Sequence, residues 1–499
     1  MTESTPSERR ASALGVLMPG FVGTTLPDWV ESLLRRGLGS VCLFGHNVDT
    51  PAQVAALTAA IHEANPRTVV AIDEEGGDVS RLHQRHGSPF PGNAVLGRID
   101  DIETTRAVGR AVGTQLADVG IHLTLAPDAD VNSNPDNPVI GVRSFGADPA
   151  AVAAHTVAWT HGVQSAGVAA CAKHFPGHGD TSADSHVSEP VVGADAAMLF
   201  DRELVPFRAA IAAGTRAIMT SHIRVPALDP DAVATFSSVV LEELLRDEMG
   251  FDGVIVTDAL DMAGASGTIG MPAAAVAAIA AGADMLCLGS NNSEHEVEAI
   301  IDTLVNADQA GELPPGRLAG AAERCASLAR SATAQPRAGS EDRRSTSGAV
   351  VDVRRVASSF TLSARAETLL ASSASSASSA SSASSVRWVR IEPEPNIAVG
   401  ETPLGPFFDG GAVPSLVVPL DDRDVAAEYA TGPDVLTLVV GRELHRDHGA
   451  LAAATTIADS CDALVVDLGF VDSDLVDIAT FGASRLVGEA LLALVESSA

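Results

Sequence analysis

The stretch GVAACAKHFPGHGD, residues 167–180, is a short apolar run followed at once by a polar loop that contains proline and glycine. The apolar run predicts a strand at 167–172 that is buried on both faces, as strands of parallel sheets are. Proline and glycine impose the special backbone angles of a loop, so Lys173 and His174 are expected just beyond the carboxyl end of this strand.

Seven similar runs alternate with alanine-rich helical stretches through the first 330 residues. They lie at 15–18, 40–44, 68–72, 122–126, 216–220, 253–257 and 284–288. Eight strands that alternate with helices predict an α/β fold, a (β/α)8 TIM-type barrel. A doubly wound open sheet is the alternative that this pattern leaves open.

Polar residues follow several of these strands at the end where a barrel enzyme carries its active site. Asp73 follows the third strand, Lys173 and His174 the fifth, Ser221 and His222 the sixth, and Asp258 the seventh. Solvated loop residues would be scattered over both ends of the strands. The pattern therefore predicts a catalytic rim.

The loop after the fifth strand continues to Asp184-Ser185-His186. An ionised Asp184 can hold one imidazole nitrogen of His186, and a histidine titrates near neutrality, which suits a proton donor and acceptor. A structural histidine is the alternative. Asp258 is a lone carboxylate at a strand end, which suits a nucleophile, although an N-cap of the following helix is also consistent with this position.

Lys173 is the only lysine of the chain, since the other 31 of 32 basic residues are arginine. This usage indicates a place where an ammonium serves and a planar guanidinium does not. The histidines and aspartates of the loop also suggest a metal cluster. Metal-dependent barrel hydrolases usually supply a His-x-His pair from the first strand, which here ends Met18-Pro19-Gly20-Phe21. We therefore expect no metal and no other cofactor.

Five motifs follow one another in a fixed order: IDEEGGDVSR (72–81), VIGVRSF (139–145), KHFPGHG (173–179) with DSH (184–186), MTSH (219–222) and VTDALDM (256–262). In this order they resemble glycoside hydrolase family 3, in its β-N-acetylhexosaminidase branch. The resemblance covers roughly residues 12 to 330, and the combination of KHFPGHG with DSH in one loop is its most specific part.

The resemblance implies a retaining hydrolase that releases terminal β-linked N-acetylglucosamine from cell-wall-derived or chitin-type oligosaccharides. Asp258 would be the nucleophile, and His186, oriented by Asp184, the acid/base. The sugar hydroxyls would be bound by five residues: Asp73, Arg81, Arg143, Lys173 and His174. One departure is Asp78, where many relatives carry arginine or glutamine.

Three rival functions remain open at this point. A phosphorylase for β-N-acetylglucosaminides would use the same residues with phosphate as the acceptor. A β-glucosidase or β-xylosidase of the same family would lack the DSH loop. A non-catalytic sugar-binding protein would need no nucleophile.

Composition narrows the setting of the protein. With 32 basic and 64 acidic residues the net charge is -32, which disfavours nucleic acid as a partner. The five cysteines are widely spaced and odd in number, as expected for buried thiols of a reducing compartment.

Arg9-Arg10 precedes an apolar stretch that Pro19-Gly20 interrupts, so we interpret it as a first strand and not as an export signal. No apolar run reaches the roughly 18 residues of a membrane span. We expect a cytoplasmic protein; the oligomeric state is not indicated.

The sequence changes character after residue 330, and residues 371–385 repeat Ala-Ser-Ser five times. Such a tract predicts a flexible linker. We therefore expect a catalytic barrel over 12–335, a linker over 336–385 and a smaller α/β domain over 386–499.

Overall fold

The structure, a computed structural model, describes residues 5–182, 190–334, 350–377, 386–394, 398–424, 435–461, 463–470 and 474–497. Its contacts divide the chain into two compact units. Unit 1 contains Met1–Glu75, Ile102–Ile140 and Gly146–Gly348, and unit 2 contains Gly76–Asp101, Gly141–Phe145 and Ala349–Ala499.

Unit 1 contains all eight predicted parallel strands. They are β1 (Leu17–Met18), β2 (Ser40–Leu43), β3 (Val69–Ile72), β6 (Leu123–Thr124), β7 (Ala169–Phe175), β8 (Ala217–Thr220), β11 (Val254–Val256) and β12 (Leu286–Cys287). Six of them pair in the order β11-β8-β7-β6-β3-β2, and β1 pairs with β12.

Backbone hydrogen bonds join these two groups of strands into a ring. The carbonyl of Met285 accepts from Thr257 N, that of Met18 from Leu288 N, and that of Pro19 from Cys42 N, at 2.9, 3.1 and 3.0 Å. The predicted (β/α)8 barrel is therefore confirmed, and the doubly wound alternative is wrong for this part of the chain.

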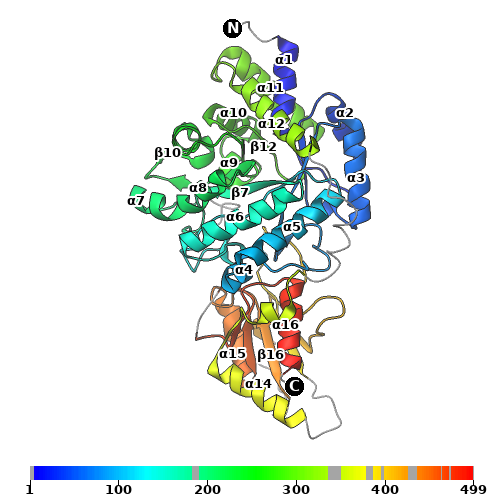
Figure 1. The fold of residues 1–499 in the computed structure, drawn as a ribbon, viewed down its shortest axis with the longest axis vertical. Helices are drawn as coiled ribbons and strands as arrows, with labels where there is room; N and C mark the ends of the chain where they lie inside the picture. The colour runs from blue at the N-terminus through cyan, green and yellow to red at the C-terminus, as the bar shows by residue number, and fades with distance from the viewer. Residues whose placement is uncertain are drawn as a thin grey trace. The chain divides into compact units, whose positions relative to one another are not determined.

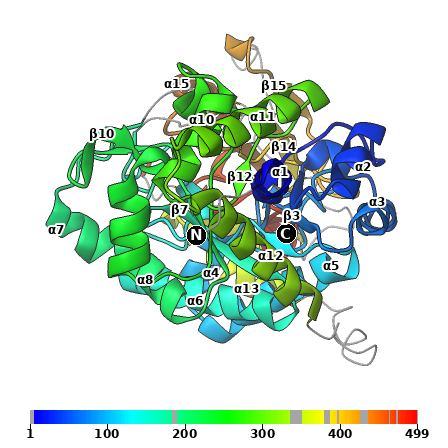
Figure 2. The ribbon, with the colours of Figure 1, turned by 90° about the horizontal axis from the view of Figure 1, so that it is seen from above.

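A helix follows each strand, and Figure 2 shows these helices arranged around the strands. They are α2 (Asp28–Arg35), α3 (Pro51–Ala64), α5 (Ile102–Asp118), α6 (Pro149–Ser165), α8 (Leu204–Ala212), η5 (Val239–Glu248), α10 (Met271–Ala281) and α11 (Glu294–Ala310), with α12 (Arg317–Ala334) last. Three of them begin at a side-chain cap that accepts a backbone N–H of the first turn: Thr50, Asp148 and Ser293.

The first strand is shorter than predicted. Helix α1 (Pro6–Val16) takes Gly15 and Val16, and leaves only Leu17–Met18 for β1. The helix is favoured locally, because Thr5 and Glu8 form a capping box around Pro6 and the following residues include good helix formers. The apolar run at 15–18 gave no sign of this boundary.

Inward-facing side chains fill the barrel. This core includes Met18, Cys42, Ala71, Leu123, Cys171, Met219, Val256 and Cys287, each contributed by a different strand. All five cysteines of the chain are buried thiols, as expected from their number and spacing.

Shorter elements lie between the barrel strands and their helices or in the segments assigned to unit 2. They are η1 (Gly45–Asn47), β4 (Glu74–Gly76), β5 (Val79–Ser80), α4 (Asn93–Ile99), η2 (Gly141–Arg143), α7 (Ala196–Met198), η3 (Leu199–Glu203), β9 (Arg224–Val225), β10 (Asp229–Val233), η4 (Ala234–Phe236) and α9 (Ala263–Ser266).

Unit 2 is built on a six-stranded sheet. Its order is β13 (Thr361–Leu362), β18 (Ile478–Ala479), β17 (Leu464–Asp467), β16 (Thr437–Gly441), β14 (Arg387–Ile391) and β15 (Leu416–Val418). All neighbours are parallel except β13 and β18. Figure 1 shows α15 (His448–Cys461) and α16 (Arg485–Glu496) on either side of β16. A smaller α/β domain after the barrel is thus present, as predicted.

The segment predicted as a linker contains ordered elements between its undescribed parts. Residues 350–377 form α13 (Val353–Ala357), β13 and α14 (Ala364–Ala377), and β13 pairs with β18. Helix α14 extends through residues 371–377 of the Ala-Ser-Ser tract, because alanine is the best helix former and serine is tolerated. Residues 335–349 and 378–385 lie outside the described residues, so the proposed boundaries at 335 and 385 stay a prediction.

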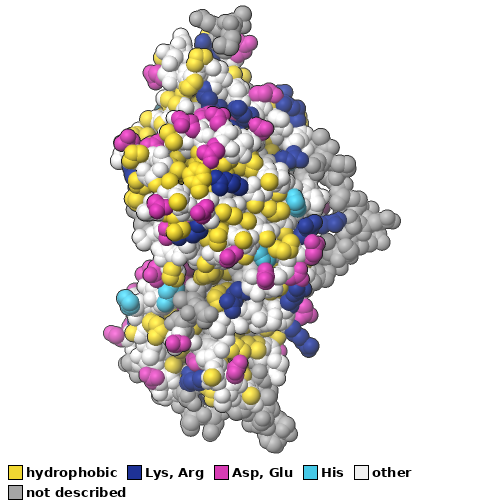
Figure 3. Space-filling view, turned by 60° about the vertical axis from the view of Figure 1, so that its left-hand side comes forward, with side chains coloured by type: hydrophobic (Ala, Val, Ile, Leu, Met, Phe, Trp, Pro, Cys, Tyr) yellow, Lys and Arg dark blue, Asp and Glu magenta, His cyan; other side chains and the backbone are white. Residues whose placement is uncertain are grey.

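Acidic and basic side chains are interspersed on the face drawn in Figure 3. Among the described residues, no helix combines the length and the apolar character needed to cross a membrane.

Candidate active site

The only lysine of the chain lies between two carboxylates. Its Nζ is 2.8 Å from Asp73 Oδ1 and 2.7 Å from Glu75 Oε1, and the Lys173 side chain is only 3% exposed. A buried ammonium is stable only where opposite charges and hydrogen bonds compensate its desolvation, and here two carboxylates do so. The structure brings Asp73 and Lys173 together, and it adds Glu75, which the sequence reasoning missed although it lies in the same motif as Asp73.

The pKa of the Cys171 thiol is shifted by burial and by charged side chains of the predicted site. Burial raises its pKa, the nearby ammonium of Lys173 lowers it, and the carboxylates of Asp73 and Asp258 raise it further. Asp73 follows β3, Lys173 lies near the end of β7 and Asp258 follows β11, so the parallel strands of the ring bring all three to the same end of the barrel. This is the convergence that the rim hypothesis requires.

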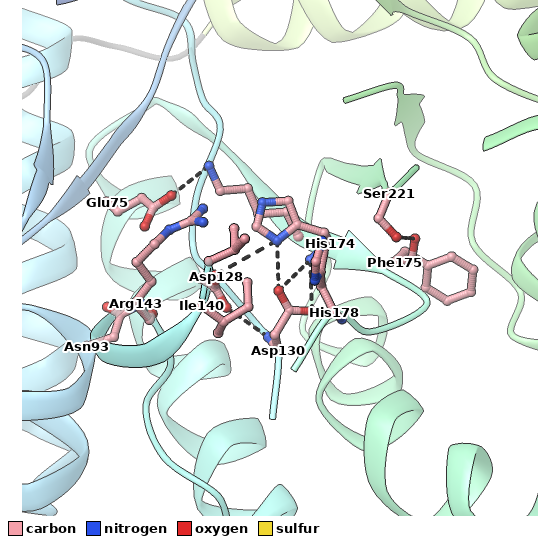
Figure 4. Close-up of polar contacts among 12 residues, drawn as sticks. Glu75, Asn93, Asp128, Asp130, Ile140, Arg143, His174, Phe175, His178 and Ser221 are labelled. Carbon is pink, nitrogen blue, oxygen red and sulfur yellow. Dashed lines mark hydrogen bonds and ion pairs between the residues drawn. The ribbon is translucent and has the colours of Figure 1, made fainter. Parts of the chain in front are cut away.

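Asp130 fixes the end of β7 and the loop after it; Lys173 and His174 lie within this strand, and not just beyond it as predicted, because the strand extends to Phe175. The Asp130 carboxylate accepts the backbone N–H of His178 at 2.7 Å and of His174 at 3.2 Å, and it lies 2.7 Å from His174 Nδ1 (Figure 4). Because a carboxylate only accepts, Nδ1 carries the hydrogen, and the imidazole is fixed in one orientation. Asp130 was missed, although the segment Pro127-Asp128-Ala129-Asp130 places it just after the fourth strand.

One group of side chains among the described residues could hold a metal ion, because its ligand atoms lie within 4.8 Å of one another. It consists of Asp128, Asp130 and His174. Their hydrogen bonds explain the cluster in another way. The Asp128 carboxylate accepts the backbone N–H of Asp130, while Asp130 accepts from His174 and His178. A network of this kind needs no ion to hold it.

Asp258 lies two residues beyond the end of β11 and is half-buried. Its Oδ1 accepts the backbone N–H of Ala259 at 2.8 Å, and the carbonyl of Ala259 lies 3.0 Å from His222 Nε2. The buried imidazole of His222 thus holds the residue next to Asp258. The N-cap interpretation is wrong, because the next described helices begin at Ala263 and Met271, with Met262 and Gly270 as their caps.

A second buried carboxylate lies against the KHFPGHG loop. Glu203 has no exposed surface, and burial raises its pKa to about 7. Its Oε1 accepts from Arg202 Nε at 2.6 Å, and Arg202 also donates to Asp180 at 2.7 Å. A Cβ at Gly177 would lie 2.9 Å from Glu203 Oε2, so only glycine allows this approach. Glu203 was missed because it follows the loop by more than twenty residues and carries no motif of its own.

The remaining predicted residues fall elsewhere. Arg81 and Arg143 belong to unit 2, where the guanidinium of Arg81 donates to the carbonyls of Ala398 and Val399. Asp184 and His186 lie outside the described residues. Their roles as acid/base and orienting group therefore stay predictions.

Comparison with known proteins identifies the family. The sequence pattern described as "Glycosyl hydrolase family 3 N terminal domain" matches residues 22–328, more than half of the chain. The chain belongs to glycosyl hydrolase family 3. The resemblance drawn from the five motifs is thereby confirmed, and the protein is a glycoside hydrolase by family.

Similar curated proteins bear one name. The chain is 40% identical over 285 residues to "Beta-hexosaminidase A" of Pseudoalteromonas piscicida, covering 52% of this chain and 48% of that protein. It is 35% identical over 315 residues to "Beta-hexosaminidase" of Alkalilimnicola ehrlichii, covering 62% and 89%. The chain thus spans about half the length of the first relative and most of the second.

Solved structures of the family extend the likeness to both units. The β-N-acetylglucosaminidase of glycoside hydrolase family 3 from Paenibacillus sp. str. FPU-7 has a TM-score of 0.81 and 28% identity over 98% of this chain and 97% of that one. NagZ from Neisseria gonorrhoeae, solved with N-trifluoroacetyl-D-glucosamine, has a TM-score of 0.53 and 31% identity over 63% of this chain and 98% of that one.

Replacing Lys173 by arginine is expected to damage this family 3 enzyme although the charge is kept. A planar guanidinium is bulkier than an ammonium and cannot place one point charge between Asp73 and Glu75. We expect kcat/KM to fall by about tenfold or more. Steady-state kinetics on a chromogenic N-acetyl-β-glucosaminide, with circular dichroism as the folding control, measures this. An unchanged kcat/KM would refute a functional role for the ammonium.

The raised pKa of Glu203 predicts a pH-dependent stability. Because the folded-state pKa of about 7 exceeds the usual 4.5, the folded protein binds more protons in this window. The free energy of unfolding should therefore fall as the pH rises from 4.5 to 7, by up to about 3 kcal/mol. Urea denaturation at pH 5 and pH 7.5 should show this loss in the wild type and a smaller one in Glu203→Gln. The exposed Glu103→Gln is the control; an equal loss in all three proteins would contradict the prediction.

Proposed function

We propose that this family 3 enzyme is a retaining β-N-acetylhexosaminidase that removes terminal β-linked N-acetylglucosamine through a glycosyl-aspartate intermediate. The observation that supports the proposal is that Asp258, Asp73 and Lys173 lie at the carboxyl ends of parallel strands of one barrel, with Lys173 paired to Asp73. The likeness of almost the whole chain to a β-N-acetylglucosaminidase supports the choice of sugar.

In the proposed mechanism Asp258 attacks the anomeric carbon. The N–H of Ala259 holds one carboxylate oxygen, and His222 holds the carbonyl of Ala259, so the attacking group is oriented before substrate binds. Protonated His186 would give its proton to the leaving oxygen, and Asp184 would stabilise the imidazolium. Neutral His186 would then activate the acceptor that releases the sugar, so that the anomeric configuration is retained.

The sugar hydroxyls would be bound by donors and acceptors that the structure holds in fixed positions. Asp73 can accept from hydroxyls while Lys173 donates. His174 has Nδ1 engaged by Asp130, which leaves its orientation independent of substrate. Arg81 and Arg143 would add further donors.

The proposed substrates are cell-wall-derived or chitin-type oligosaccharides in the cytoplasm. NagZ from Neisseria gonorrhoeae, solved with an N-acylated glucosamine, shows that a similar barrel accepts this class of sugar. We propose no cofactor and no nucleic-acid partner. A non-catalytic sugar-binding protein is disfavoured, because binding alone does not require a carboxylate placed and oriented like Asp258.

Asp258→Asn is expected to abolish hydrolysis of a chromogenic N-acetyl-β-glucosaminide that the wild type cleaves. The amide cannot form the glycosyl ester, yet it keeps the size of the side chain, so the melting temperature should change little. Asp252→Asn, an exposed residue just before β11, is the matched control and should retain full activity. A fluorinated sugar that traps the intermediate should label Asp258, and a label on another residue would overturn the assignment.

Water is proposed as the acceptor in preference to phosphate. A neutral His186 would not repel phosphate as a glutamate would, but Asp184 and the net charge of -32 oppose an anion. Product analysis at rising phosphate concentration should give N-acetylglucosamine as the main product with constant turnover. If N-acetylglucosamine 1-phosphate predominated and turnover rose with phosphate, the enzyme would be a phosphorylase, with the nucleophile unchanged.

A further inference from the structure

The sheet of unit 2 has the topology of a doubly wound fold. Among its parallel strands, β14 lies between β15 and β16, so the strand order reverses next to β14. Sheets of this kind bind ligands beyond the carboxyl ends of their strands, next to such a reversal. In this protein, residues that follow three of these strands contact another part of the same unit, the segment 76–101.

Asp78 makes the most buried of these contacts. Its Oδ2 accepts from Arg442 Nη2 at 2.5 Å, one residue past β16, and its Oδ1 accepts the N–H of Ala483 at 2.7 Å, four residues past β18. The side chains of Asp78 and Arg442 are 3% and 10% exposed. Removal of either partner would leave a buried charge uncompensated.

Arg81 continues the attachment toward β14. Its Nη2 donates to the carbonyl of Ala398 at 2.8 Å and its Nη1 to that of Val399 at 3.0 Å, in the connection that follows β14. A guanidinium has five N–H donors in a rigid plane, and two of these bonds fix that plane. The side chain of Arg81 is therefore oriented by carbonyls of unit 2.

The segment 76–101 also contacts the segment that carries Arg143. The amide of Asn93, at the start of α4, donates to the backbone carbonyl of Arg143 at 2.6 Å, and Figure 4 shows these two residues together. Helix α4 also packs directly on the 141–145 segment, since a Cβ at Gly97 would lie 1.8 Å from the carbonyl of Phe145. At its far end, Arg98 donates to Ser359 and lies over the ring of Phe481 at 3.8 Å.

We propose that unit 2 acts as a positioning module, which uses the ligand-binding edge of its doubly wound sheet to hold the segments that carry Arg81 and Arg143. Arg442 is then a positioning residue for sugar binding, acting through Asp78. The inference rests on the proposed function, in which both arginines bind the sugar. It gives the small domain a role in catalysis without any reacting group of its own.

The position of Asp78 in the sequence strengthens the inference. It lies only three residues before Arg81, whose guanidinium donates to carbonyls of the same unit. The chain between Asp78 and Arg81 spans at most about 10 Å, so an anchor on Asp78 also limits where Arg81 can lie. Loss of the Arg442 contact should therefore weaken sugar binding more than folding.

The test uses the full-length enzyme and a chromogenic N-acetyl-β-glucosaminide. Arg442→Gln should lower kcat/KM by roughly tenfold, mainly through a higher KM, because the sugar donors are no longer held in place. Arg442→Lys should recover much of the loss, since an ammonium can still reach Asp78. Asp78→Asn keeps the size of the side chain and an acceptor for Ala483, and it should show the same rise in KM if Arg442→Gln fails to fold.

Arg423→Gln is the matched control. Arg423 pairs with Asp447 at 2.9 Å in the same unit, is similarly shielded, and donates to Glu392 and Val418. It should lower the melting temperature as Arg442→Gln does, with KM unchanged. Equal KM values in the Arg442, Asp78 and Arg423 variants and in an active wild type would overturn the inference alone. An inactive wild type would overturn the proposed function and the inference with it.

Discussion

The ammonium of Lys173 is buried between the carboxylates of Asp73 and Glu75, and the arrangement of the rim depends on this group of three charges. A charge removed from water is tolerated only where its partners cannot move away. The partners come from the end of β3 and the segment directly after it, and the lysine comes from β7. The barrel supplies the required rigidity, because both strands belong to its hydrogen-bonded ring. The same constraint explains why a chain that otherwise uses arginine keeps one lysine.

The other charged groups of the site are positioned by the same principle. Asp130 is buried, and it is compensated by the backbone N–H and the imidazole of His174 in β7 and by the backbone N–H of His178 in the loop that follows. Glu203 is buried against that loop, where Arg202 donates to it, and burial raises its pKa to about 7. The loop is thus bounded on one side by a well-compensated carboxylate and on the other by a poorly compensated one. Glu203 is therefore a group beside this loop whose charge changes near pH 7.

Much of this arrangement could be predicted from the sequence, because it depends on local patterns. Apolar runs located the eight strands, and polar residues at their carboxyl ends located Asp73, Lys173, His174 and Asp258. Asp130 and Glu75 also follow barrel strands, so the same pattern could have identified them. The end of helix α1 could not be predicted in this way, because the local sequence at Gly15 and Val16 is compatible with both helix and strand.

Other features depend on contacts between residues far apart in the chain. Asp78 and Arg442 are separated by 364 positions, and nothing in either local sequence indicates the other. Asp78 departs from the arginine or glutamine of many relatives. This departure singled out the position, but it did not indicate that Arg442 is its partner. Arg81 is a second example. The sequence predicted it as a sugar ligand, and nothing in its local sequence indicated that its guanidinium donates to the carbonyls of residues 398 and 399.

The residues proposed to bind the sugar are divided between the two units. Asp73, Lys173 and His174 are held by barrel strands, whereas Arg81 and Arg143 lie on segments that pack with the C-terminal part of the chain. A nucleophile needs a rigid support, which a closed barrel provides, but the shape of a sugar pocket depends on loops. Within unit 2, buried polar contacts hold the two segments that carry Arg81 and Arg143. On the positioning role proposed for it, the small domain would contribute preorganisation, which lowers the entropic cost of binding a flexible, hydroxyl-rich ligand.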